Sequence, residues 1–418
     1  MSEKNVPNVR FKGFSDSWEQ RQLKEDVQRI KSYSFTREVE TEKNTGMKYI
    51  HYGDIHTGIA DKINDPNVLP NIHYGDFNQL DTNDVVVADA SEDYKGIADA
   101  SILLNKSNFQ VIAGLHTISL RPQQTKLDPL FLYYLLKTNS FKHHGYRVGT
   151  GLKVFGITFE NLTKFEYLAP KVAEQNRIAM LINIVDEIIA SNQRKLDQLK
   201  EVKKLLMQKI FDQEWRFKGF TDPWEQRKLG NLIKIDKEQE VKKETLDNSG
   251  NGYYVLAMRT FSTDGYIDFS KPYWSSNVKT NKEDQFLLPG EFAIIDADMD
   301  SKLPKIGKVL FNSYDQKFLL AAHVRKILVN HKYNDTFIYA LMRNDDLLKQ
   351  LKLEAGGSIS KRLLDKNVYK QNVRVPSNKE QNQIGELSKI IEKNIASNQQ
   401  KLDQLKEMKK WFMQNMFV

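Results

Sequence analysis

The chain has 418 residues, of which 40% are hydrophobic and 28% are charged, and it carries a formal net charge of +8. This composition excludes a collagenous or wholly disordered polymer, allows two or three folded domains, and favours an anionic partner. Cysteine is absent, which excludes disulfide frameworks, cysteine-ligated zinc, iron–sulfur clusters and thiol nucleophiles and suits a reducing, cytoplasmic setting.

The first ten residues are polar, so we expect no signal peptide at this end of the sequence. The longest apolar run, Leu130–Leu136, has seven residues. A membrane-spanning helix needs roughly 18. We therefore expect a protein that does not enter a membrane.

Residues 10–23 open a sequence that returns later in the chain. RFKGFSDSWEQRQL at 10–23 matches RFKGFTDPWEQRKL at 216–229 in 11 of 14 positions, at an offset of 206 residues. Such agreement indicates an internal duplication. Trp18 and Trp224, which occupy the same place in the two copies, are predicted to pack as hydrophobic anchors.

The inserts that follow, residues 24–165 and 230–371, are far less alike, although faint echoes keep nearly the same spacing. DVVVADA at 84–90 resembles EFAIIDA at 291–297, and both segments are predicted to be strands. His116 and His323 each open a further apparent strand, and we interpret both as hydrogen-bonded structural histidines rather than catalytic groups. Both inserts are therefore predicted to share one mixed α/β fold. Their divergence suggests that they recognise different things, while unequal drift after duplication is the alternative explanation.

Glycine-rich segments occupy matching places near the end of each insert, at Arg147–Lys153 and Glu354–Lys361. Glycine there would let backbone amides approach a phosphate. With other basic residues of the inserts they form the set predicted to bind phosphate, for which ordinary solvated surface charge is the alternative. The set comprises Arg37, Lys48, Lys95, Gly96, Arg147, Gly149, Thr150, Gly151, Lys153, Arg259, Lys279, Lys302, Lys305, Lys308, Gly356, Gly357, Ser358 and Lys361.

Two long helices are predicted over residues 174–211 and 380–417, because these segments contain no proline and, apart from Gly385, no glycine. Ala190–Phe211 and Ala396–Phe417 agree in 16 of 22 positions, again at an offset of 206. Both helices carry apolar residues at the a and d positions of a heptad, which is typical of a coiled coil. The departures recur as well: lysine stands at a d position in both copies, as Lys203 and Lys409.

The natural partner of each long helix is the other copy, so we predict an antiparallel pair related by a pseudo-two-fold. Asn192 and Asn398 lie near the midpoints of the two helices, where a polar a position fixes register at some cost in stability. An amide that reaches solvent at the edge of the seam is the alternative. The second RFKGF motif directly follows the first helix, and by symmetry the first motif should dock at the end of the second helix. This arrangement makes the repeat circular, with each insert at one end of the pair.

Catalytic motifs are sparse in the sequence. There is no Walker loop, dinucleotide fingerprint, HExxH, GxSxG or NPPY-type tetrapeptide. Asp93-Tyr94-Lys95 matches the loose acid-x-Lys end of nuclease sites, but such triplets arise readily by chance in a highly charged chain. The segment 296–307 begins like a calcium loop but has Ser301 and Gly307 where the sixth-position glycine and the bidentate glutamate are required. We therefore predict no catalytic residue and no metal site.

The duplicated GFxDxWEQR frame, the Pro and Glu-Gln-Asn helix starts at 170–176 and 376–382, and the DQLK of both helices together resemble the specificity subunit of type I restriction-modification enzymes. The resemblance covers essentially the whole chain, and staphylococcal-type members look most similar. It implies an α+β protein with two target-recognition domains separated by two long antiparallel coiled-coil helices. The implied domains are residues 1–170 and 214–376, with spacer helices at 171–213 and 377–418.

The same resemblance implies a non-catalytic, cytoplasmic subunit whose two domains each read one half of a bipartite site on double-stranded DNA. It implies two methyltransferase subunits docked on the helices and two restriction subunits in the full complex. S-adenosylmethionine, ATP and magnesium are then expected on the partner subunits, and no cofactor on this chain. A stand-alone DNA nuclease using Asp93 and Lys95, or a coiled-coil adaptor that binds proteins alone, would be the other functions.

Overall fold

A computed structural model of the protein describes residues 6–92, 96–151, 154–237, 241, 245–247, 249–262, 265–269, 271–276, 285–357 and 360–418. The chain divides into two compact units: unit 1 contains residues 1–191 and 403–418, and unit 2 contains residues 192–402. Each unit holds one insert and part of both long helices, α5 (Val172–Phe211) and α9 (Asn378–Asn415). We call residues 24–165 the first module, residues 230–371 the second module, and the repeated remainder the frame. The two long helices of the predicted α+β architecture are confirmed.

The first module is built on a five-stranded sheet whose central strand, β7 (Val85–Ala88), is buried throughout. Because side chains alternate along a strand, Val85 and Val87 pack into the core that contains three of the module's helices, while Val86 and Ala88 pack into the core under the second sheet. The five-stranded sheet has the order β2 (Val27–Ile30), β11 (Thr117–Pro122), β7, β9 (Ala100–Leu103) and β5 (Lys62–Ile63). The second sheet has the order β10 (Gln110–Ala113), β4 (Met47–Ile50), β6 (Asn71–Ile72) and β3 (Glu40–Thr41). The module's helices are α1 (Tyr52–His56), α2 (Pro129–Leu135), α3 (Asn139–Val148) and α4 (Phe159–Thr163).

The second module repeats this plan with different residues. Its central strand, β19 (Phe292–Ile295), again turns alternate side chains into two cores, one containing α6 (Asp335–Met342) and one under the second sheet. One sheet has the order β15 (Ile233–Ile235), β23 (Val324–Val329), β19 and β21 (Val309–Phe311), and the other β17 (Trp274–Ser275), β16 (Tyr253–Leu256), β22 (Phe318–Leu320) and β18 (Phe286–Leu287). Two further helices are α7 (Asp345–Leu353) and α8 (Asp365–Tyr369). The prediction of one shared mixed fold is confirmed.

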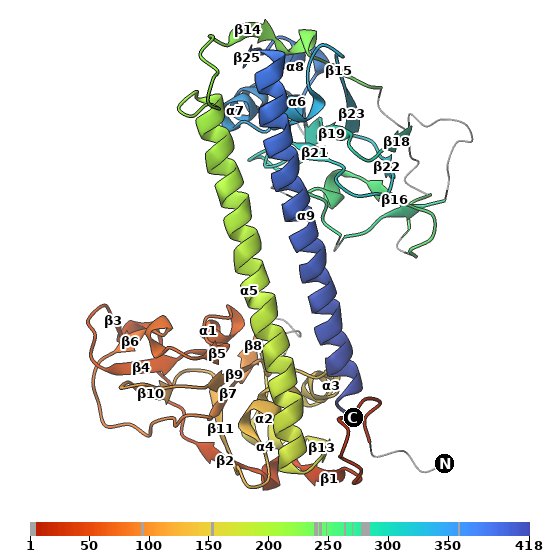
Figure 1. Ribbon diagram of the computed structural model, residues 1–418. Coiled ribbons are helices and arrows are strands. Elements are labelled where there is room, and N and C mark those ends of the chain that lie inside the picture. The colour runs from red at the N-terminus through yellow and green to blue at the C-terminus, as the bar shows by residue number, and fades with distance from the viewer. Residues whose placement is uncertain are drawn as a thin grey trace. The chain divides into compact units, whose positions relative to one another are not determined.

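The frame closes each module with a two-stranded antiparallel ladder. In unit 1, β1 (Glu19–Gln22) pairs with β13 (Glu166–Ala169) and the two strands lie side by side near the start of α5 (Figure 1). In unit 2, β14 (Glu225–Lys228) pairs with β25 (Asn372–Val375) in the same way. The tryptophans that precede β1 and β14, Trp18 and Trp224, are buried in the cores of their units, as predicted.

The repeated arginine and glutamate of the frame form one contact in both units. Arg10 donates two hydrogen bonds to Glu174, at 2.6 and 2.8 Å, and Arg216 donates two to Glu380, at 2.9 and 2.7 Å. A guanidinium that binds a carboxylate through two parallel bonds fixes orientation as well as charge. The RFKGF motif of each unit is thereby tied to the first turn of a long helix.

The repeated glutamine explains why the helix starts are so alike. The buried Gln175 side chain donates to the carbonyls of Lys126 and Pro170 and accepts from the backbone N–H of Asp128, which caps α2. Gln381 makes the equivalent bonds to Pro376 and to the backbone N–H of Asn334, the cap of α6. A buried amide with these partners is costly to replace. The contact between each module and the start of its long helix therefore depends on a glutamine that the frame supplies.

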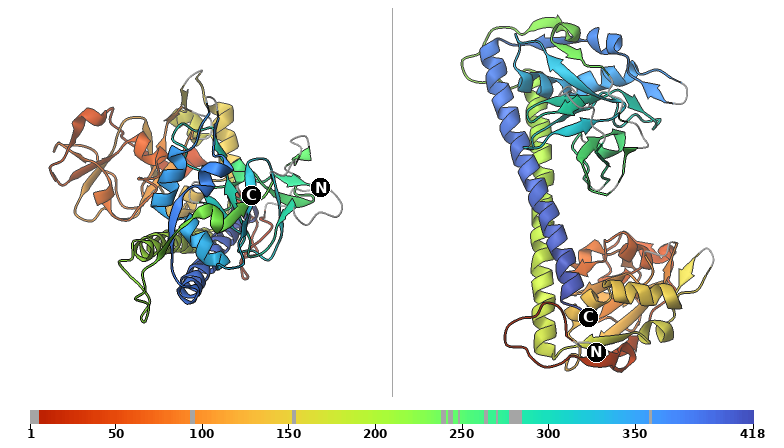
Figure 2. Two further views of the ribbon diagram at one scale, coloured as in Figure 1. Left: turned by 90° about the horizontal axis from the view of Figure 1, so that it is seen from above. Right: turned by 90° about the vertical axis from the view of Figure 1, so that its right-hand side faces the viewer.

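Within each unit the two long helices run antiparallel. In unit 1 the start of α5 shares a core with Met416 and Phe417, just after α9, whereas Asp186 further along α5 meets Lys409 at 2.5 Å. In unit 2, Lys203 of α5 contacts Glu392 of α9. Figure 2 shows the C-terminal end of α9 lying against the elements of unit 1. The antiparallel pairing predicted from the heptads is confirmed inside each unit.

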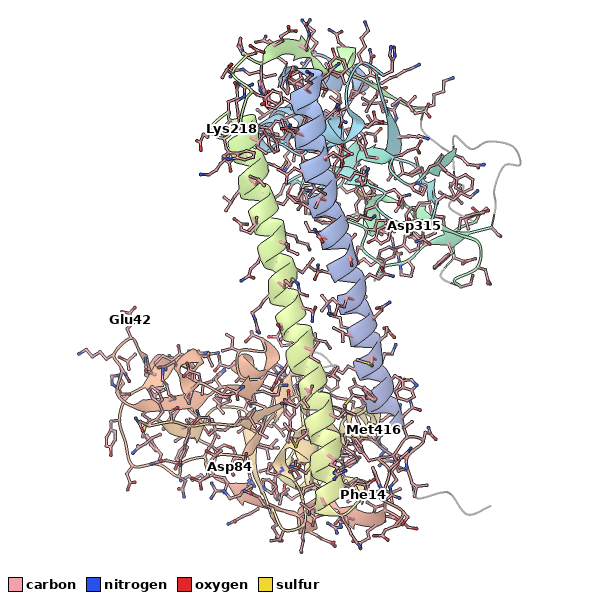
Figure 3. The ribbon with its side chains drawn as sticks, viewed as in Figure 1. Phe14, Glu42, Asp84, Lys218, Asp315 and Met416 are labelled. Atoms are coloured by element: carbon pink, nitrogen blue, oxygen red, sulfur yellow. The ribbon has the colours of Figure 1, made fainter. Side chains whose placement is uncertain are left out.

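The N-terminal motif docks at the end of α9, as the circular repeat predicts. The backbone N–H of Val9 donates to the carbonyl of Asn415 at 3.0 Å, and Phe11 packs into the same core as Met416. Figure 3 places Phe14 and Met416 close to the ends of the two long helices in unit 1. Arg177 of α5 lies over the Phe14 ring, 5.4 Å from the ring centroid, which is within the limit of about 6 Å for a cation–π contact.

In unit 2 the second module meets the helices through a buried polar cluster. Glu392 of α9 accepts hydrogen bonds from Lys203 of α5 and, at 2.6 Å, from the Tyr339 hydroxyl of α6. Arg343 donates to the same hydroxyl at 3.0 Å. Burial and the neighbouring Arg343 lower the pKa of Lys203 to about 7, and although burial alone would raise the pKa of Glu392, Lys203 and Arg343 hold it below its usual value. The lysine at the recurring d position thus serves a tertiary contact.

Unit 1 uses the equivalent lysine differently. Asp186 of α5 accepts from Lys409 of α9 at 2.5 Å, from Lys62 at 3.1 Å and from the Tyr134 hydroxyl at 2.9 Å. Burial opposes ionisation, but Lys409 and Lys62 lower the pKa of Asp186. Beside this cluster Lys137, at the position that corresponds to Arg343, donates to a carboxylate oxygen of Asp61. The two units therefore attach their modules with the same helix lysine but with different acids.

Candidate nucleic-acid interface

The glycine-rich segments form the same hairpin in both modules. Thr150 and Gly156 exchange two backbone hydrogen bonds, at 3.0 and 2.8 Å, and Gly356 and Arg362 exchange the equivalent two, at 3.0 and 2.7 Å. Gly151 has φ of 133° and Gly357 has φ of 131°. A Cβ at Gly151 would lie 1.9 Å from the Val154 carbonyl oxygen, so no other residue fits this turn. The sequence prediction that these segments are equivalent is confirmed by their geometry.

Each hairpin joins the end of the central strand of its module. The strand β12 (Phe155–Gly156) pairs with β8 (Ala90–Ser91), and β24 (Lys361–Arg362) pairs with β20 (Ala297–Asp298). Backbone bonds extend the connection: the N–H of Ile157 donates to the carbonyl of Asp89, and the N–H of Leu363 donates to the carbonyl of Asp296, both at 2.8 Å. The aspartates at the ends of β7 and β19 therefore hold the hairpins in place.

The same two aspartates also bind the two histidines. Nδ1 of His116 lies 3.1 Å from Oδ1 of Asp89, and Nδ1 of His323 lies 3.0 Å from Oδ1 of Asp296. The backbone N–H of each aspartate donates to the carbonyl of its histidine, at 3.0 and 3.1 Å. Both histidines have a left-handed backbone, with φ of 53° and 67°, which costs energy in a residue other than glycine. The prediction that they are hydrogen-bonded histidines that open strands is correct.

Several of the predicted basic residues of the second module gather around Asp298, two residues after Asp296. The carboxylate of Asp298 accepts from the backbone N–H of Lys305 at 2.8 Å, and Asp298 pairs with Lys361 across the β20–β24 ladder. The Lys305 amine reaches the carbonyl of Met258 at 2.9 Å, next to the exposed Arg259. Lys302 is exposed on the same turn. The structure brings these four basic residues and the hairpin of Gly356 and Gly357 together.

The first module brings together fewer of its predicted residues. Arg147 is exposed near the end of α3, and Gly149 and Thr150 lead directly from that helix into the hairpin. Gly96 packs against Ser91 and His56, where an added Cβ would lie 2.6 Å from the serine oxygen. These residues share the end of β7 with Asp89, so the two modules carry their candidate residues at equivalent places.

Arg37, Lys48 and Lys308 do not join these clusters: Arg37 is exposed but bound to two carboxylates, and the two lysines are buried or half-buried. Arg37 binds Asp54 and Glu40, each at 2.7 Å, and these carboxylates raise its pKa although burial opposes the shift. Lys48 is buried, donates to the carbonyl of Leu69 at 3.0 Å, and has its pKa lowered by burial. Lys308 is half-buried in a recess formed with α5 and α7. Lys48 thus makes its hydrogen bond inside the first module, whereas Arg37 makes its ion pairs at the surface of that module.

Other predicted residues lie outside the described part of the chain. These are Lys95, Lys153, Lys279 and Ser358, together with Asp93 of the nuclease hypothesis. Of the two register asparagines, Asn398 donates its side-chain amide to the carbonyl of Asn394 at 2.7 Å and Asn192 is half-buried. Their role in fixing the register stays a prediction.

Sequence reasoning underestimated the two Asp–His pairs and two nearby arginines. Arg325 and Arg362 both approach the second carboxylate oxygen of Asp296, each at 3.5 Å. The available signal was the recurrence of aspartate and histidine, 27 residues apart in both modules. What the sequence does not display is that the histidine backbone is left-handed and that three separate segments converge on each aspartate.

The chain matches a family model described as "Type I restriction modification DNA specificity domain" over residues 15–201 and again over residues 221–407. It is 21% identical over 435 residues to the type I restriction enzyme MjaVIII specificity subunit of Methanocaldococcus jannaschii, which covers 98% of this chain and 94% of that protein. The crystal structure of the type I restriction-modification system S subunit from M. genitalium superposes with a TM-score of 0.67 at 14% identity and covers 99% of both chains. Among the residues that the structure describes, no helix is long and apolar enough to cross a membrane.

Proposed function

The chain belongs to the type I restriction-modification DNA specificity family, and we propose that each of its two modules reads one half of a bipartite site on double-stranded DNA. It is the DNA specificity subunit of a type I restriction-modification system, the component that confers specificity without catalysing a reaction. The observation that carries the proposal is the contrast between a nearly constant frame and two modules of one fold with different residues at the hairpin and strand end. Two modules that share one fold but differ in their surface residues suit two half-sites of different sequence.

The residues we propose for DNA contact are those that the hairpins and the ends of β8 and β20 bring together. Gly149, Thr150 and Gly151 with Arg147 form this set in the first module, and Gly356 and Gly357 with Lys361, Lys302, Lys305 and Arg259 form it in the second. Phosphates would be bound by the cations and by backbone amides, while base edges would be read by the side chains that differ between modules. Lys95, Lys153, Lys279 and Ser358 remain members of the set by sequence.

The long helices are the proposed ruler that sets the gap between half-sites. α5 has 40 residues, which corresponds to about 60 Å at 1.5 Å per residue. DNA half-sites read by a paired protein are commonly one helical turn, about 34 Å, apart. If a heptad is inserted into both helices, the recognised gap should lengthen while both half-sites stay the same. An unchanged gap would contradict the ruler.

Each unit also carries an exposed apolar patch on its helix pair that suits a docked protein. In unit 1 the exposed apolar residues of the helix pair include Ile184 of α5 and Met408 and Trp411 of α9. The corresponding residues in unit 2 are Ile390, Leu205 and Val202, which are also exposed. Exposed apolar patches mark interaction sites.

Two equivalent patches in one chain suit two copies of one partner, and we propose that these are the two methyltransferase subunits. Two restriction subunits complete the proposed complex, in which S-adenosylmethionine, ATP and magnesium belong to the partner subunits. We propose a cytoplasmic location for this complex. The frame motif also favours the staphylococcal-type subfamily, on the likeness of its repeated residues.

Methylome sequencing of cells that express this chain with its methyltransferase tests the proposal. The expected result is one methylated motif made of two specific half-sites and an unspecified gap. A contiguous motif, or no methylation that depends on this chain, would contradict it.

A further inference from the structure

The Asp–His pairs are closely alike in the two modules, although the modules otherwise differ in sequence. Histidine and aspartate take the same place, the same ring nitrogen binds the same carboxylate oxygen, and the backbone of both histidines is left-handed. The neighbours are unlike. His116 packs edge-on against Tyr52, with ring centres 5.3 Å apart, whereas the aspartate of His323 is flanked by two arginines.

Both imidazoles lie at the surface. The side chain of His116 is 49% exposed and that of His323 is 31% exposed, while Asp296 is buried and Asp89 is half-buried. A carboxylate beneath an exposed imidazole orients the ring through the hydrogen bond at Nδ1. Because Nδ1 is bound to the carboxylate, a hydrogen bond from either ring to a further group is made through Nε2.

The position of each pair links it to the candidate interface. Asp89 accepts from the N–H of Ile157 at the end of one glycine hairpin, and Asp296 accepts from the N–H of Leu363 at the end of the other. Each histidine therefore binds the aspartate whose backbone carbonyl holds the hairpin. Strained backbone persists only where the surrounding structure holds it, and functional sites are among the places where it clusters.

We propose that His116 and His323 each bind a phosphate of the DNA backbone through Nε2. This inference rests on the proposed function. A contact that is common to two readers of unlike half-sites carries no sequence information, so it belongs to the phosphate backbone, which is the same at every site. An imidazole ring that donates from Nδ1 to the carboxylate and from Nε2 to a phosphate oxygen makes a charge-assisted hydrogen bond to that oxygen, and the pair then fixes the register of each module on the duplex.

The test uses the double variant His116→Asn, His323→Asn in the complex with the methyltransferase subunits. Asparagine tolerates the left-handed backbone, so the turn is kept while the cationic donor is removed. The affinity should fall about tenfold for a duplex that contains the methylated motif and by the same factor for a duplex without it. The slope of log affinity against log salt should become shallower by about 2, since each phosphate contact accounts for about 0.9.

The matched control is His143→Asn, His331→Asn, which changes one exposed histidine in each unit and should leave affinity and slope unchanged. Equal affinity of wild type and the His116, His323 variant for both duplexes would overturn the inference, and a lower thermal stability beside that equal affinity would show a purely structural role. A loss confined to the duplex with the motif would show a base contact and would overturn it too. If the wild-type complex itself shows no preference for the motif, the proposed function fails rather than this inference.

Discussion

The two units attach their modules to the helices with the same lysine, yet they bury it to different extents. In unit 2 the side chains of Lys203 and Glu392 are 6% and 5% exposed, whereas in unit 1 those of Lys409 and Asp186 are 32% and 15% exposed. The frame sequence around the lysines is nearly identical. The environment of a repeated residue is therefore set by the module that packs on it. The same frame sequence need not contribute the same free energy of unfolding in the two units.

The largest expected effect comes from removing the acid of the buried cluster. Glu392→Gln leaves Lys203 and Arg343 in a buried site without the carboxylate that compensates them, and should lower the free energy of unfolding by about 3 to 5 kcal/mol. The matched variant in unit 1, Asp186→Asn, affects a partly exposed pair and should cost about 1 kcal/mol. Urea denaturation of both variants measures the difference. Equal losses would show that the two contacts are energetically alike despite their burial.

The pH dependence of stability sharpens the same comparison. Because the pKa of folded Lys203 is about 7 and the ordinary value is 10.5, the unfolded chain binds more protons between these values. The free energy of unfolding should therefore rise with pH between 7 and 9, by about 1 kcal/mol per pH unit. Lys203→Met should remove this rise.

The control for the pH experiment is Lys409→Met, which deletes the equivalent lysine from unit 1 and should leave the rise in place. Denaturant titrations at three pH values for the wild type and both variants decide the outcome. A rise that persists in Lys203→Met would assign the pH dependence to another group.

The frame glutamines should behave alike, in contrast to the clusters. Gln175→Ala and Gln381→Ala each leave a buried proline carbonyl and the backbone N–H of a helix cap without a partner. Each variant should lose about 1 to 3 kcal/mol of stability, and the two losses should agree closely. A large difference between them would mean that the modules alter the frame contacts as well.

The smallest expected effect on stability concerns the exposed patches. Trp411→Ser and Leu205→Ser change exposed residues of the helix pair and should alter the free energy of unfolding by no more than about 0.5 kcal/mol. Both should nevertheless weaken the complex with the methyltransferase, as measured by calorimetry. Glu407→Ser, an exposed polar site on the same helix, is the control. Unchanged affinity in both variants would place the docking surface elsewhere.

The frame could be predicted from the sequence because its information is local and repeated. The period of apolar residues predicts α5 and α9, and the offset of 206 residues predicts the equivalence of the hairpins and the docking of the first motif on α9. The sheets of the modules were not predictable in the same way, since strands such as β4 and β10 pair in parallel across about 60 residues. Such pairing leaves no short-range signal.

The candidate site was also predictable only in part, because only some of its features leave a local signal in the sequence. Glycine at Gly151 and Gly357 reports a backbone requirement directly, whereas a basic residue type does not report burial. Arg37 is a surface cation but is engaged by two carboxylates, and Lys48 is buried against a carbonyl. The Asp–His pairs depend on three segments that meet only in the folded module.

The central claim is that the frame is constant while each module reads one half of the site. The most direct measurement is the methylome of cells in which residues 24–165 are replaced by the same insert of another specificity subunit with a different motif. The account predicts a new motif in which one half-site changes while the other half-site and the gap stay the same. An unchanged motif, or a change in both halves, would contradict it.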